Sequence, residues 1–130
     1  MYSDSAQSQE LLETSYAAAL KKHQDANSPL VIQFSADWCS HCIKMKKEVF
    51  EPLAKSGELD QVSYVYLNIK DPANKNIYTT FKSRLQVNSL PLLVFLTKDK
   101  NGKYQSKHFV GGKRIDFIRE EISKILSNAQ

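Results

Sequence analysis

The chain has no hydrophobic run long enough to cross a membrane, and near its start the apolar stretch Ala17–Leu20 is too short for a signal peptide. It also has no internal repeats, no low-complexity tract and no sign of a second domain. Its 130 residues therefore predict one domain, residues 10–130, which follows a flexible polar segment, residues 1–9. The polar start also fits the beginning of a mature exported form.

A strong charge of either sign is missing as well. The formal net charge is +4, and no arginine-rich stripe or alternation of basic and aromatic residues occurs. Lysine clusters such as Lys21-Lys22 and Lys113-Arg114 are typical of solvated faces. We therefore expect neither nucleic-acid binding nor membrane insertion.

Cysteine is scarce, and both cysteines lie in one tetrapeptide, Cys39-Ser40-His41-Cys42. A pair so close in sequence cannot join distant parts of the chain, so it indicates nothing about the redox compartment. An apolar run, residues 30–34, precedes the tetrapeptide and a helical pattern follows it. Both thiols should therefore lie on the first turn of a helix, where unpaired N–H groups and the helix dipole stabilise a thiolate. This arrangement predicts a thiol–disulfide redox site.

Two other interpretations of the cysteine pair remain open. The pair could hold a soft metal such as Cu(I), or zinc, in a binding module without catalytic activity, with His41 as a further ligand. A zinc site would need two more ligands, and none of His23, His41 and His108 shows ligand spacing to the cysteines. The pair could also be inert in the core. We favour redox chemistry, with no metal and no cofactor other than the Cys39–Cys42 disulfide itself.

Hydrophobic spacing predicts eight elements in the order α-β-α-β-α-β-β-α. Pro52 should kink or end the second helix near Phe50, and Asp71 fits as the cap of the third. A helical crossover and a hairpin then give a mixed sheet of four strands with helices on both faces. The expected helices are residues 10–27, the stretch after the cysteines, the stretch from Asp71-Pro72 and the stretch after Gly111-Gly112; the expected strands are 30–35, 62–69, 92–96 and 103–110.

Four segments together resemble the thioredoxin-fold family over nearly the whole chain, and the first of them is most similar to bacterial thioredoxin-like domains of the thiol:disulfide interchange type. They are Phe34-Ser35-Ala36-Asp37-Trp38-Cys39-Ser40-His41-Cys42, Leu67-Asn68-Ile69, Leu90-Pro91 and Val110-Gly111-Gly112. The resemblance implies an α/β fold, a thioredoxin-like three-layer α/β/α sandwich. It also implies that Cys39 is the attacking, partly exposed thiol and Cys42 the buried resolving thiol.

The resemblance assigns further roles around the disulfide. Pro91 would be a cis-proline facing the disulfide, and Leu90 would offer its backbone to an extended substrate peptide. Trp38 would be a partly exposed ring that shapes the substrate surface, although a core tryptophan is the alternative. His41 should stabilise the Cys39 thiolate and make the couple more oxidising, unless it is an exposed histidine without a partner.

The chain also departs from ordinary thioredoxin. Gln33 stands where thioredoxin buries an aspartate beneath the resolving cysteine, and Tyr66 stands where the partner lysine would be. The familiar proton acceptor is therefore missing. Water, Asp37 or Glu48 must take the proton from Cys42 if exchange is fast.

These observations predict a thiol–disulfide oxidoreductase that acts on protein thiols or disulfides. We expect a monomer whose partner is another redox protein. A bacterial periplasm is the favoured compartment and the cytoplasm is the alternative. The sequence leaves the direction of electron flow open.

Overall fold

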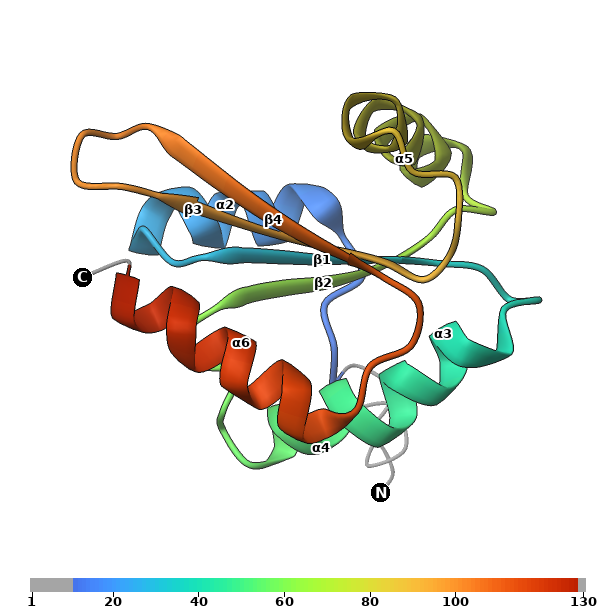
Figure 1. Cartoon of the computed structure of the whole chain (residues 1–130), viewed down its shortest axis with the longest axis horizontal. Coiled ribbons are helices and arrows are strands. Elements are labelled where there is room, and N and C mark those ends of the chain that lie inside the picture. The colour runs from blue at the N-terminus through green and yellow to red at the C-terminus, as the bar shows by residue number, and fades with distance from the viewer. Residues whose placement is uncertain (1–10, 129–130) are drawn as a thin grey trace, which may run out of the picture.

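The computed structural model describes residues 11–128 and contains a four-stranded mixed sheet with helices on both faces (Figure 1). In the order β2-β1-β3-β4, β1 pairs in parallel with β2, and the other two pairings are antiparallel. The predicted α/β class and mixed sheet are confirmed, and the predicted flexible segment, residues 1–9, lies outside the described residues. The strands are β1 (Leu30–Ser35), β2 (Ser63–Asn68), β3 (Leu92–Lys98) and β4 (Tyr104–Val110).

The helices divide between the two faces of the sheet (Figure 1). One face is covered by α2 (Tyr16–Ala26) and α5 (Pro72–Leu85). The other face is covered by α3 (Ser40–Met45), the π-helical turn η1 (Lys46–Phe50), α4 (Glu51–Lys55) and α6 (Ile115–Asn128).

Strand β1 lies in the middle of this sandwich. Val31 packs toward α6, whereas Leu30 and Ile32 pack toward α2 and α5, because successive side chains of a strand point to opposite faces. All six residues of β1 are buried. The carboxyl end of a fully buried strand is a rigid place from which to present a reactive group.

The first helix begins later than the sequence predicts, so the expected start at residue 10 is wrong. Helix α2 begins at Tyr16, where the Ser15 hydroxyl accepts a hydrogen bond from the Ala18 N–H at 3.2 Å. Upstream, the Glu13 carbonyl accepts the Tyr66 N–H at 2.8 Å, along the outer edge of β2. Leu12, which fitted the helical spacing, is instead buried in the core on the opposite face of the sheet.

The helix after the cysteines does not end near Phe50, but its hydrogen-bond pattern changes there, where Pro52 was expected to kink or end it. It continues through η1 into α4, and the Glu51 N–H bonds to the Lys46 carbonyl five residues earlier. The wider turn changes the hydrogen-bond pattern just before the proline. Pro52 therefore lies in the first turn of α4, where a missing N–H is tolerated.

Other local predictions are confirmed. The Asp71 side chain accepts the Ala73 N–H at 3.0 Å and caps α5. The turn between β3 and β4 is closed by a hydrogen bond of 2.9 Å from the Gly102 N–H to the Asp99 carbonyl. Gly102 has a φ of 79°, which glycine adopts without strain.

Helix α6 is tied to the sheet by a nearly buried carboxylate. Glu121 accepts hydrogen bonds from the ammonium groups of Lys107 on β4, at 3.0 Å, and Lys124, at 3.3 Å. Burial acts to raise the pKa of Glu121, but the two lysines outweigh it and hold that pKa below its ordinary value.

Candidate active site

The two cysteines lie where β1 ends and α3 begins. Cys39 is the N-cap of α3, and its Sγ accepts a hydrogen bond from the Cys42 N–H at 3.2 Å. The two residues form a disulfide, with their Cα atoms 5.3 Å apart. When the disulfide is reduced, the same N–H group points at the Cys39 sulfur and favours its thiolate form.

The two cysteine residues differ little in their exposed fraction. Cys39 is 7% exposed, less than the partly exposed thiol that was expected, and Cys42 is 0% exposed. Ala36, Ile69 and Leu90 pack around the pair. Cys39 is therefore the less buried of the two cysteines, although both are buried.

The Leu90–Pro91 peptide bond is cis, in agreement with the expectation for Pro91. Leu90 packs beside the disulfide, and the Pro91 carbonyl accepts the Gly111 N–H at 2.9 Å. Among residues 11–128, the N–H and carbonyl of Leu90 make no hydrogen bond. That backbone is therefore available to a strand that binds beside the disulfide.

Trp38 is 78% exposed, so the core-tryptophan alternative is wrong. Its ring lines two shallow hollows, one with Asp37 and Lys70 and one with Leu90. A large flat apolar side chain next to Cys39 offers a contact surface for a bound peptide.

Beneath the disulfide lies a neutral hydrogen-bond network in place of a carboxylate. Gln33 is fully buried, and its amide donates to the Cys42 carbonyl at 3.1 Å and to the Ser35 hydroxyl at 3.0 Å. The amide oxygen accepts the Tyr64 hydroxyl at 2.8 Å. Burial raises the pKa of Tyr64 well above its ordinary value, so this hydroxyl stays protonated. The sequence carries no local signal for Tyr64, because its position beside Gln33 depends on strand register.

Neither carboxylate that was considered as a proton acceptor contacts the disulfide. Asp37 accepts a hydrogen bond from the Asn68 amide at 2.7 Å in an exposed position. Glu48 is exposed on η1. Within the described part of the chain, neither side chain bonds to a cysteine. Tyr66 is half-buried, with the Lys46 ammonium 4.9 Å from the centre of its ring.

His41 lies in the first turn of α3 and is exposed. It packs against the connection between β4 and α6, because a Cβ atom added at Gly112 would lie 3.7 Å from its Cβ and 3.8 Å from its Nδ1. Its ring makes no hydrogen bond to any residue in the range 11–128.

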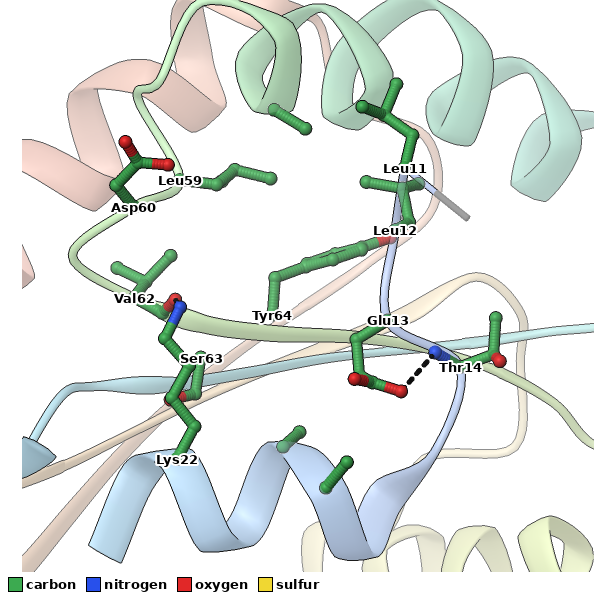
Figure 2. Close-up of a pocket in the computed structure, with 13 residues that line it drawn as sticks. Leu11, Leu12, Glu13, Thr14, Lys22, Leu59, Asp60, Val62, Ser63 and Tyr64 are labelled. Carbon is green, nitrogen blue, oxygen red and sulfur yellow. Dashed lines mark hydrogen bonds between the residues drawn. The ribbon is translucent and has the colours of Figure 1, made fainter. Parts of the chain in front are cut away.

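A separate hollow lies beside the outer edge of β2, lined by Leu12, Glu13, Lys22 and Tyr64 among others (Figure 2). The Lys22 ammonium donates to the Val62 carbonyl at 3.0 Å, and the Tyr64 ring points toward Leu12. The hollow has a volume of about 450 Å³ and shares no lining residue with the hollows around the disulfide. None of its described lining residues is a histidine or a cysteine.

No group of three or more histidine, cysteine, aspartate or glutamate side chains within the described range is arranged to hold a metal ion. None of the helices described is both long and apolar enough to cross a bilayer.

A model of the thioredoxin-like domain family matches residues 16–125. The chain belongs to the thioredoxin-like domain family. The family, the predicted fold and the predicted enzyme class, thiol–disulfide oxidoreductase, agree with one another.

The chain is similar to one curated protein, the thioredoxin-related protein DsbJ of Chlamydia pneumoniae, with 31% identity over 102 residues. The match covers 72% of this chain and 29% of that protein, so the chain spans less than a third of the length of its relative.

Solved thioredoxin structures share the fold. A thioredoxin from Thermus thermophilus superposes with a TM-score of 0.69 at 18% identity, covering 91% of this chain and 89% of the other. The Fasciola hepatica thioredoxin superposes with a TM-score of 0.60 at 25% identity, covering 84% of this chain and 93% of the other.

Proposed function

We propose that this protein is a thiol–disulfide oxidoreductase that exchanges disulfides with protein substrates through Cys39 and Cys42. The observation that carries the proposal is the position of the pair: the disulfide lies at the start of α3, the Cys39 sulfur accepts a helix N–H, and the unpaired backbone of Leu90 lies beside the disulfide. The redox group is the disulfide itself.

In the reducing direction, the Cys39 thiolate attacks one sulfur of a substrate disulfide. The other substrate sulfur leaves as a thiolate and takes a proton. Cys42 then loses its proton and attacks the Cys39 sulfur of the mixed disulfide, which releases the first substrate sulfur. Two electrons pass from the protein to the substrate, and the Cys39–Cys42 disulfide forms. The oxidising direction runs through the same steps in reverse.

The surrounding residues position the substrate. An extended segment would pair with the Leu90 backbone and lie along the cis-Pro91, with Trp38 against one side of it. Gln33 and Tyr64 supply no proton acceptor at neutral pH, so the Cys42 proton would pass to water or to the departing substrate thiolate. We place the protein in a bacterial periplasm as a monomer, with another redox protein as its partner.

The reduction potential of the Cys39–Cys42 couple tests the proposal. The protein is equilibrated with glutathione buffers and alkylated, and its modified thiols are counted by mass. With a thiolate stabilised by the helix start and His41, we expect a value above that of thioredoxin, about −270 mV. His41→Pro should shift the potential toward the thioredoxin value. A protein that forms no disulfide in any buffer would refute the proposal.

Trapping tests whether the substrates are proteins. In a Cys42→Ser variant the mixed disulfide cannot be resolved, so disulfide-linked partners should accumulate and disappear on reduction. The Cys39→Ser/Cys42→Ser variant, which lacks the attacking thiol, is the control. The metal-binding alternative predicts instead that purified protein carries stoichiometric Cu(I) or zinc, which elemental mass spectrometry measures.

A further inference from the structure

A cleft lined by positive charge lies beside the disulfide, between α3 and the connection from β4 to α6. The cleft has a volume of about 450 Å³, and its lining includes His41, which lies between the two cysteines in the sequence. Lys44, Lys113 and Arg114 line it, and Glu48 is the one acidic residue of its described lining. The cleft is therefore a basic surface within reach of a substrate bound at Cys39.

The cations of this cleft are not neutralised by the protein. Among residues 11–128, no carboxylate lies within 4.0 Å of the ammonium group of Lys44 or Lys113. Arg114 pairs with Asp116 at 4.0 Å, but both side chains are at least 80% exposed, and so exposed a pair contributes little. The Lys113 backbone N–H donates to the Met45 sulfur at 3.4 Å, which fixes the connection against α3.

The two hollows that Trp38 lines carry charge of the same sign. Lys70, Lys75 and Lys82 line the two hollows beside Trp38, and Asp37 is their acidic residue. Across the three hollows, six basic residues stand against two acidic ones. The described lining of the three hollows therefore carries an excess of positive charge.

We propose that this basic face selects an acidic partner: a protein segment with aspartate or glutamate residues next to its own reactive cysteines, whose carboxylates bind in the cleft of Lys44, Lys113 and Arg114. The proposal rests on the oxidoreductase function and adds the class of substrate. A positive field around the site of bond exchange concentrates and orients an anionic partner before the sulfurs meet.

Two synthetic peptides of equal length test the proposal. Each holds one internal disulfide, flanked by glutamates in one peptide and by lysines in the other. The protein is reduced first, so that the two thiols of Cys39 and Cys42 supply both electrons and both protons as the peptide disulfide opens to two thiols. The rate constants are measured by separating the reduced peptides, at about 20 mM and about 200 mM salt, where charges are screened to different extents.

The glutamate peptide should react at least about tenfold faster than the lysine peptide at low salt, and the ratio should fall as salt rises. A ratio near one at low salt, with both peptides reduced, would overturn the acidic-partner proposal and leave the oxidoreductase function standing. If the reduced protein opens neither peptide disulfide, and the oxidised protein does not oxidise either peptide in its dithiol form, the oxidoreductase proposal fails and this proposal fails with it.

Charge-reversal variants test whether the preference for the glutamate peptide comes from the cleft. Lys44→Glu/Lys113→Glu should bring the ratio to one or below. The matched control is Lys100→Glu/Lys103→Glu, which changes the net charge equally but lies at the turn between β3 and β4, at the other end of the sheet (Figure 1). The control should keep the preference for the glutamate peptide. An equal loss in both variants would refute the cleft as the cause, and the salt dependence of the unmodified protein remains a test even if a variant folds poorly.

Discussion

Replacing Gln33 with leucine should destabilise the oxidised protein by about 2–4 kcal/mol, because it removes the centre of the buried network under the disulfide. Leucine nearly fills the space but forms no hydrogen bond, so the buried Tyr64 hydroxyl loses its partner, at a cost of about 1–3 kcal/mol. The Cys42 carbonyl suffers less, since it keeps the helical N–H of Lys46. Urea unfolding at constant pH measures the change.

A double-mutant cycle separates this network from simple packing. Tyr64→Phe alone leaves the Gln33 oxygen unpaired, whereas Gln33→Leu/Tyr64→Phe removes both partners together. The double variant should therefore cost less than the sum of the single variants, by about 1–2 kcal/mol. The hydrogen-bond account would be refuted if the stability losses of the two single variants add up to that of the double variant within about 0.5 kcal/mol. It would also be refuted if Gln33→Leu lowers the unfolding free energy by less than about 1 kcal/mol.

Three more outcomes are expected. The pKa of Glu121 is lower in the folded protein than its ordinary value of 4.5. Ionised Glu121 therefore stabilises the fold above pH 4.5, and this contribution is lost as the pH falls through the folded-state pKa. Urea unfolding at neutral and acidic pH should show the loss, and the Glu121→Gln variant should lose less stability on acidification than the unmodified protein. Trp38→Ala should change the unfolding free energy by less than about 0.5 kcal/mol yet slow the reduction of peptide disulfides, and an unchanged rate would remove the ring from the substrate surface. Gly111→Ala should cost about 1 kcal/mol or more because φ is 91°, whereas Gly112→Ala, with no atom closer than 3.7 Å to the new Cβ, should be nearly neutral; equal thermal unfolding of the two would contradict the backbone argument.

Local signals predicted most of the elements correctly. Apolar runs located the strands, the Asp71-Pro72 pair located the start of α5, and a turn rich in polar residues and glycine located the last hairpin. The cysteine tetrapeptide was correctly placed at the start of a helix. These features depend on propensities and caps that act within a few residues.

The error at the start of the first helix arose because distant contacts decide the structure there. Leu12 fits a helical spacing, but its burial against the far face of the sheet and the bond from Tyr66 to Glu13 keep the chain out of the helix there. Pro52 was expected to kink or end the second helix, and the π turn before it lets the helix continue into α4 with a changed hydrogen-bond pattern. Neither outcome is visible in a short window of sequence.

The sequence alone determined the chemistry of this protein, because a thiol pair at the start of a helix follows from spacing and local geometry. The tertiary structure decided what surrounds that pair. Strand register brings Tyr64 to Gln33, and the packing of the connection between β4 and α6 against α3 brings Lys113 into the same cleft as Lys44. Both arrangements join residues that are far apart in the chain, and only the packing of the sheet and helices sets such distances.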